Sequence, residues 1–151
     1  MDFEAKIAEL GLLIPKPAKP AGSYKPCVIV DNIAYISGQG PLLEDGSFAK
    51  GKVGADVDLE TAQNHARLCG LAILSALKNE IGSINKVDQL IKLTGFVNCI
   101  ESFTQQPLVI NGCSNMMKDI FGETGVHARA AVGLSHIHIS EPTRLAGIAY
   151  G

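Results

Sequence analysis

The sequence is poor in aromatic residues and lacks several common signals. It contains no tryptophan, and aromatic residues make up only 5% of its 151 positions. Aliphatic and alanine side chains must therefore fill the core. There is no run of lysine or arginine and the formal net charge is −2, so nothing favours a nucleic-acid partner or an anionic membrane. With 46% hydrophobic and 19% charged residues, the chain can bury a core, and its length fits one domain over residues 1–151.

The CxxC spacing of zinc ribbons and thioredoxin-like proteins is also missing, because no two of the four cysteines stand three positions apart. We therefore expect Cys27, Cys69, Cys99 and Cys113 to be reduced residues of an intracellular protein. The N-terminal stretch MDFEAKIAELGLLIPKP has no long apolar run. It resembles neither a signal peptide nor a transmembrane segment, which predicts a cytoplasmic protein without a membrane partner.

Helical periodicity is strongest in the middle of the chain, over residues 59–81. Asp58 can cap the start of this helix, and Gly82 stands where a C-terminal cap residue would. A second helix is predicted to begin near Pro107, a residue suited to the first helical turn, and to end before Gly122. The two apolar stripes consist of Ala62, Ala66, Cys69, Ile73, Leu77 and Ile81 in the first helix and Val109, Cys113, Met116, Met117 and Ile120 in the second.

Shorter elements precede the first long helix. Residues 2–10 predict a short helix, and the proline-rich stretch PKPAKPAG (15–22) predicts an extended connector. The stretch CVIVDNIAYIS reads as two strands around a two-residue hairpin turn at Asp31 and Asn32. A further short strand is predicted near residues 48–53.

Three more strands are predicted beyond the first long helix. They lie in residues 86–99, in GVHARAAVG (125–133) and in LAGIAYG (145–151). The first has apolar residues on both faces, with Ile91, Leu93, Gly95, Val97 and Cys99 on one face and Leu90, Lys92, Thr94, Phe96 and Asn98 on the other.

This order of elements predicts an α+β domain with two helices packed on one face of a mixed β-sheet. Two helices cover only one face of such a sheet. The opposite face would then expose apolar side chains, which is typical of an association surface. We therefore expect a homo-oligomer with pockets where subunits meet.

An arginine lies inside the apolar strand GVHARAAVG. With strand periodicity, His127, Arg129, Ala131 and Gly133 share one face, and the other face is apolar. The small side chains of Ala131 and Gly133 leave space beside Arg129, which suggests the wall of a pocket. A guanidinium there can hold a carboxylate with two parallel hydrogen bonds. The alternative is a strand-end charge that reaches solvent.

The turn SGQGP follows directly from an apolar strand. Its glycines allow close approach of the backbone to a ligand, and Ser37 adds a hydroxyl next to Gly38 and Gln39. It is not a P-loop, because the lysine and the spacing of that motif are missing. A simple turn is the alternative interpretation. Tyr24, in GSYKP, either packs or places its hydroxyl in an intersubunit cleft.

Metal binding and nucleophilic catalysis have little support. His127, His136 and His138 are near one another in sequence and could together hold zinc, but no glutamate or cysteine at suitable spacing completes the set. Histidines at the strand surface are the preferred interpretation. GxSxG is absent. We expect neither a metal nor an organic cofactor.

Several segments together resemble the YjgF family, also called the reactive intermediate deaminase (RidA) or L-PSP endoribonuclease-like family. These segments are ISGQGPL, GSINKVDQLIKLTGFVN, VINGCSNMMKDIFGE and GVHARAAVG. The arm LGLLIPKPAKPAGSYKP is similar to the one that begins the longer subfamily of about 150 residues. The match extends over roughly residues 9–134, and the combination is more specific than any single motif.

The resemblance implies a chorismate-mutase-like α+β fold of the bacillus type and a homotrimer with three clefts between subunits. It implies that Arg129 holds a substrate carboxylate and is the catalytic residue. It also implies that further residues line the same cleft, namely Tyr24, Ser37, Gly38, Gln39 and Asn111. The implied reaction is hydrolysis of enamine or imine acids such as 2-aminoacrylate to 2-keto acids and ammonia.

The chain departs from the family pattern in two places. Ala131 stands where the deaminase-active branch often has cysteine. The tail 135–151 lacks the usual Leu-Pro turn, and the position of the family glutamate falls at Arg144, with Glu141 the nearby carboxylate. Loss of that carboxylate puts water activation in question while leaving carboxylate binding intact.

Two other functions remain open at this level. A protein that binds or senses small 2-keto or amino acids without catalysis would use the same Arg129 cleft. An endoribonuclease is less favoured, because the acidic net charge and the few aromatic residues do not suit RNA.

Overall fold

The computed structural model describes residues 1–134 and 148–149. The predicted tail over 135–151 and the residues His136, His138, Glu141 and Arg144 therefore lie outside the described residues, apart from positions 148 and 149. The helices and strands run in the order α1 (Phe3–Glu9), β1 (Cys27–Val30), β2 (Ile33–Ile36), α2 (Leu59–Ile81), β3 (Lys92–Val97), α3 (Gln106–Phe121), β4 (Ala128–Gly133) and β5 (Ile148–Ala149).

The predicted hairpin is confirmed. Strands β1 and β2 are antiparallel and pair Val30 with Ile33. Asp31 and Asn32 form the turn with φ of 49° and 63°, which is the backbone that a two-residue turn between twisted strands requires. Asparagine and aspartate adopt such angles more readily than other non-glycine residues, so this dipeptide defines the register of the hairpin.

The predicted helices are confirmed together with their ends. The Asp58 carboxylate accepts a hydrogen bond from the Thr61 N–H at 2.8 Å at the start of α2, and Gly82 follows its end with φ of 87°. Pro107 lies in the first turn of α3, and Gly122 follows its last residue. The apolar stripe of α3 is buried throughout.

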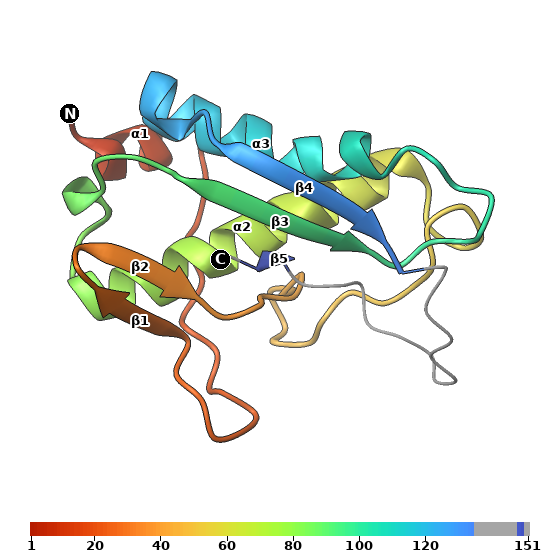
Figure 1. Ribbon diagram of the computed structural model, residues 1–151, viewed down its shortest axis with the longest axis horizontal. Helices are drawn as coiled ribbons and strands as arrows, with labels where there is room; N and C mark the ends of the chain where they lie inside the picture. The colour runs from red at the N-terminus through yellow and green to blue at the C-terminus, as the bar shows by residue number, and fades with distance from the viewer. Residues whose placement is uncertain (135–147, 150–151) are drawn as a thin grey trace.

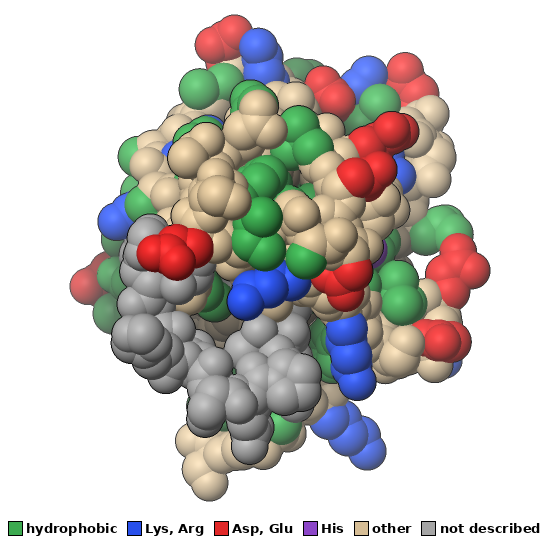
Figure 2. All heavy atoms as spheres, turned by 90° about the vertical axis from the view of Figure 1, so that its right-hand side faces the viewer, with side chains coloured by type: hydrophobic (Ala, Val, Ile, Leu, Met, Phe, Trp, Pro, Cys, Tyr) green, Lys and Arg blue, Asp and Glu red, His purple; other side chains and the backbone are tan. Residues whose placement is uncertain are grey.

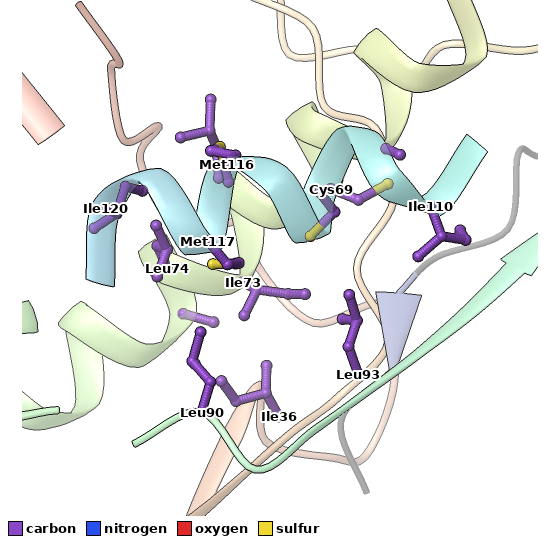
Figure 3. Packing of buried hydrophobic residues seen from close by; sticks show 14 of the residues in the cluster. Ile36, Cys69, Ile73, Leu74, Leu90, Leu93, Ile110, Met116, Met117 and Ile120 are labelled. Carbon is purple, nitrogen blue, oxygen red and sulfur yellow. The ribbon is translucent and has the colours of Figure 1, made fainter. Parts of the chain in front are cut away.

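The core lies between α2, α3 and the strands. The two helices approach closely at Gly112, where a Cβ would come within 2.0 Å of the Gln63 carbonyl oxygen of α2. Ile73 and Leu74 of α2 and Met117 of α3 fill the interior, and Leu93 of β3 points toward them (Figure 3). All of these side chains are at most 1% exposed, so the helix pair and the strands form one packed unit.

The sheet that contains Arg129 is mixed, as predicted. Its order is β4-β3-β5; β4 is parallel to β3, and β5 is antiparallel to it. Helix α2 runs behind this sheet and behind the β1–β2 hairpin (Figure 1). The parallel pair follows from the crossover through α3, which returns the chain to the edge of β3. The last predicted strand is confirmed at Ile148–Ala149.

Two details of the strand predictions are wrong. The strand over 86–99 is shorter, because a 3-10 helix occupies Ile84–Lys86 and regular pairing begins at Lys92. Before that point the alternation fails, so Leu90 is buried and Ile91 is exposed. The stretch 48–53 forms isolated bridges instead of a strand, with Phe48 paired to Leu42 and Val53 to Val57 and Cys99.

One face of the strands is not covered by any helix within residues 1–134 and 148–149. On β3 and β4 the helix-facing positions are Leu93, Gly95 and Val97 with their register partners Arg129, Ala131 and Gly133. The alternating positions face the other way and form what we call the open face. Its apolar members are Val28, Val30, Ile33, Tyr35, Phe96, Ala130 and Val132. Val30 is 52% exposed, Tyr35 45% and Val132 42%, so this face presents several exposed apolar side chains beside Lys92 and Thr94.

Helix α1 is attached to the 3-10 helix by one carboxylate. Glu4 accepts hydrogen bonds from the Ile84 N–H and the Ser83 hydroxyl, both at 3.0 Å, and pairs with the Lys78 ammonium at 3.2 Å. These interactions favour the ionised form. The backbone hydrogen bond from Ile84, followed by the one from Ser83, lowers the pKa of Glu4 below its ordinary value.

Candidate functional site

Arg129 lies near the start of β4 at the edge of the sheet. Its register partner Leu93 is fully buried under the helices, so the Arg129 side chain leaves the strand on the helix-covered face. Among the described strands β4 is at the edge of this sheet, and the guanidinium reaches α3, where it bonds two side chains. The side chain remains exposed, which makes its charge accessible from solvent.

Helix α3 holds this guanidinium at one nitrogen. Nη1 donates to the Asn111 side-chain oxygen at 2.7 Å and to the Ser114 hydroxyl at 3.2 Å. Asn111 and Ser114 are three residues apart and therefore lie on the same face of the helix. The structure thus brings together Arg129 and Asn111, both of which the sequence analysis assigns to one cleft.

A histidine extends the hydrogen-bond network behind Ser114. His127 Nε2 lies 3.0 Å from the Ser114 hydroxyl oxygen, and His127 Nδ1 lies 2.7 Å from the Gly125 carbonyl oxygen. Both contacts are partly buried. His127 precedes β4 directly and shares a strand face with Arg129, so the two side chains reach the same side of α3.

The space expected beside Arg129 is partly filled. Ala131 packs against the hydrophobic core. A Cβ on Gly133 would come within 2.7 Å of the Gln106 side-chain nitrogen of α3. The prediction of an empty pocket wall along Ala131 and Gly133 is therefore wrong, because the start of α3 occupies that volume.

The turn after β2 forms a second, separate group of candidate residues. The Ser37 hydroxyl donates to the Lys25 carbonyl at 2.7 Å, and the Gln39 amide donates to the Ser37 carbonyl at 3.1 Å. Gly38 is exposed with open space around it, and Tyr24 is 52% exposed. These hydrogen bonds keep the turn in its own shape, whereas those of Arg129 go to α3. The single chain does not bring the two groups into contact through any of these bonds.

The remaining titratable candidates are buried or partly buried. All four cysteines are buried, and none of them forms a disulfide. Burial raises the pKa of Cys113 to about 12, so its thiol stays protonated even though Arg129 lies near enough to lower the value slightly. Burial also lowers the pKa of His65. No cluster of metal-ligating side chains occurs within residues 1–134 and 148–149, and the proposed partners of His127 at positions 136 and 138 lie outside that range.

The surface near the start of α3 carries charges of both signs. Figure 2 shows acidic and basic side chains interspersed with hydrophobic ones on this end of the molecule. Such a surface lacks the uniform positive potential that nucleic-acid binding requires. Within the described part of the chain, no helix is both long enough and apolar enough to cross a membrane.

The mixed sheet, the two covering helices and the arginine at the sheet edge define a chorismate-mutase-like α+β protein. The family described as "YjgF/chorismate mutase-like, putative endoribonuclease" matches residues 4–138. The chain therefore belongs to the YjgF/Rid family.

Individual relatives agree with this assignment. Protein TCP17 of Trypanosoma cruzi is 36% identical over 134 residues, which cover 88% of this chain and 84% of that protein. The crystal structure of Atu1372 from Agrobacterium tumefaciens is 39% identical with a TM-score of 0.80, covering 97% of this chain and 90% of that one. A "putative endoribonuclease" from Shewanella oneidensis is 28% identical with a TM-score of 0.90, covering 98% and 96% of the two chains.

Two residues of this hydrogen-bond network are not predicted from the sequence. Ser114 is not among the candidate residues, and His127 is predicted to be a histidine at the strand surface, with metal binding as the alternative. The signal available in the sequence was the spacing: Ser114 follows Asn111 by one helical turn, and His127 precedes Arg129 by one strand period. That α3 and β4 place these pairs opposite each other is a result of tertiary packing.

Proposed function

We propose that this protein hydrolyses reactive enamine or imine acids of the 2-aminoacrylate type to 2-keto acids and ammonia. The observation that carries the proposal is which nitrogens of the Arg129 guanidinium are hydrogen-bonded. Its Nη1 is held by α3, while its Nε and Nη2 hydrogens bond to no described residue and its side chain is exposed. That free edge presents two parallel donors, the arrangement that binds a carboxylate.

The proposal places the reaction between subunits of a homotrimer. The open face, with Val30, Tyr35 and Val132 each more than 40% exposed, supports association of this kind. In such an assembly the turn with Ser37, Gly38 and Gln39, together with Tyr24, would face Arg129 of a neighbouring copy. This would account for two groups of candidate residues that do not meet within one chain.

The chemistry asks little of the protein. The imine carbon is already electrophilic, so binding the carboxylate and orienting a water molecule are the main requirements. An enamine acid such as 2-aminoacrylate first tautomerises to the imine, gaining a proton at its methylene carbon and losing one from its nitrogen. Water then adds to the imine carbon, and a proton of that water passes to the nitrogen, which gives a carbinolamine. Collapse of that intermediate forms the keto group and releases ammonia. No metal or organic cofactor takes part in these steps.

A non-catalytic binder of small 2-keto or amino acids is the second candidate. The specific observation behind it is the composition of the network at Arg129. Its described members are an amide, a hydroxyl and an imidazole, and no described carboxylate is bonded there. A site without a carboxylate could bind the substrate class without efficient water activation. The mixed charges at the surface (Figure 2) do not favour the endoribonuclease alternative.

The test is turnover of an imine acid generated in place. A serine-consuming lyase supplies 2-aminoacrylate, and pyruvate appearance is followed with and without this protein. We expect acceleration by the wild type and at least about a hundredfold loss in Arg129→Ala, because the carboxylate loses its charged partner. Arg67→Ala removes an exposed arginine of α2 and is the matched control. No acceleration by the wild type, with 2-oxobutyrate still raising its melting temperature, would favour the binder.

A further inference from the structure

We propose that His127 and Ser114 are positioning residues for Arg129, and that they determine which edge of the guanidinium meets the substrate carboxylate. This inference rests on the proposed function for its ligand. It concerns a chain of hydrogen bonds that runs from the Gly125 carbonyl through His127 and Ser114 to Arg129.

The direction of each bond follows from the first one. A backbone carbonyl only accepts hydrogen bonds, so at 2.7 Å from the Gly125 oxygen His127 Nδ1 carries the proton. In the neutral ring Nε2 is then the acceptor, and the Ser114 hydroxyl donates to it across 3.0 Å. The lone pairs of the hydroxyl oxygen remain for Arg129, whose Nη1 donates to it at 3.2 Å.

These bonds use one end of the guanidinium completely. Nη1 carries two hydrogens, of which one goes to Ser114 and the other to Asn111 at 2.7 Å. Rotation that would present Nη1 to a ligand breaks both bonds. The edge formed by Nε and Nη2 is therefore the one offered for two parallel hydrogen bonds to a carboxylate.

His127 supplies what Ser114 alone lacks. A serine within a helix readily turns its hydroxyl back to the carbonyl four residues earlier, which here belongs to Ile110. In that rotamer the oxygen no longer has to face Arg129. The imidazole holds the hydroxyl proton on its own side and so keeps the oxygen directed at Nη1.

Gly125, at the other end of this series of hydrogen bonds, lies in a closely packed part of the structure. Gly125 is buried at the end of the 3-10 helix Gly122–Gly125, and a Cβ there would come within 2.4 Å of the Met117 carbonyl oxygen. The Gly125 carbonyl is therefore fixed relative to α3. Through it the imidazole position is fixed before any ligand arrives, which is the preorganisation that a carboxylate site needs.

The test compares two substitutions of His127 that differ in reach. His127→Asn keeps a donor near the Gly125 carbonyl but is too short to contact Ser114. His127→Gln can place an amide oxygen where Nε2 lies. With 2-oxobutyrate as the probe, calorimetry should give about a tenfold weaker Kd for His127→Asn and for Ser114→Ala, and a Kd within about threefold of wild type for His127→Gln. 2-Oxobutanamide, which has no carboxylate, should show no such differences.

A double-mutant cycle separates positioning from general structural damage. If His127 acts through Arg129, His127→Asn weakens 2-oxobutyrate binding in the wild-type background and has no further effect in Arg129→Ala. Equal losses in both backgrounds, or a loss in His127→Gln as large as in His127→Asn, would overturn the proposal. Melting temperatures of all variants are compared at the same protein concentration.

A readout without ligand distinguishes failure of this inference from failure of the proposed function. In protein labelled with ¹⁵N-arginine, the held Arg129 should show separate Nη signals, and these should average in His127→Asn and Ser114→Ala but not in His127→Gln. If the wild-type protein shows this pattern but binds no 2-oxobutyrate, the proposed carboxylate site is contradicted, whereas the positioning of Arg129 by His127 and Ser114 is supported. Identical Arg129 signals in all variants would contradict the proposal that His127 and Ser114 position Arg129.

Discussion

The two faces of the β3–β4 pair lie in opposite environments. Leu93 and Val97 face the helices and are at most 1% exposed, whereas Val132, one strand away and facing outward, is 42% exposed. Each face has apolar side chains and one cation, Arg129 on the helix-covered face and Lys92 on the open face. The difference lies in what covers them, because α2 and α3 lie on one side only (Figure 1).

The two faces contribute differently to the candidate site. The helix-covered face determines the fold and also carries Arg129, whose guanidinium reaches out at the sheet edge to α3. The open face contributes little to the fold of one chain. It is free to associate, and the proposed trimer uses it to bring the turn after β2 to Arg129 of another copy. Substitutions on the helix-covered face should therefore lower the stability of the fold, whereas substitutions on the open face should weaken association.

The largest expected effect is on the helix-covered face. Leu93→Ala should lower the free energy of unfolding by about 2–5 kcal/mol, because it removes a fully buried side chain and leaves a cavity beneath the helices. Urea denaturation measures the change. Val132→Ala on the open face is the matched control and should cost well under half as much in the dissociated chain. Equal losses at the two positions would contradict the division into a folding face and an association face.

An intermediate effect is expected on the open face. Val132→Asp should weaken the proposed self-association by at least about tenfold in the dissociation constant, because it places a charge on the surface through which the copies are proposed to associate. Sedimentation velocity measures the assembly, and circular dichroism checks that helix content is unchanged. Leu108→Asp, on an exposed position of α3, is the control and should leave assembly intact. A Val132→Asp protein that associates like the wild type would show that this face is not the interface.

The smallest effect is expected away from both faces, at the attachment of α1. Glu4 has a lowered pKa in the folded chain, so its stabilising contribution is fully present above the ordinary value of 4.5 and is lost as pH falls through the folded value. Glu4→Gln should lower stability by less than about 1 kcal/mol at pH 7, since the group is partly exposed.

The pH dependence provides the check on Glu4. The stability difference between wild type and Glu4→Gln should shrink as the pH falls below 4.5. Thermal melts from pH 3 to pH 7 measure this difference. A gap that stays constant over that interval would show that the charge of Glu4 does not hold α1.

The elements with strong local signals were predictable from the sequence. The cap at Asp58, the proline in the first turn of α3 and the Asp31–Asn32 turn each depend on the backbone within a few residues: a capped N–H, a fixed φ without an N–H to pair, and positive φ angles. The start of β3 was not predictable in the same way. The alternation of apolar residues continues through Leu90 and Ile91, but pairing with β4 begins only at Lys92, and pairing is a long-range property.

The candidate site likewise combines features with a local sequence signal and features that depend on tertiary packing. The sequence by itself determined that Arg129 lies on a strand among small residues and that Asn111 belongs to a helix with an apolar stripe, because both depend on periodicity. Only the tertiary structure decided that Asn111 and Ser114 hold one end of the guanidinium with His127 behind Ser114, and that Gln106 fills the space beside Gly133. Spacing along a chain defines which face a side chain occupies, whereas the neighbour across that face is defined by how helix and sheet pack.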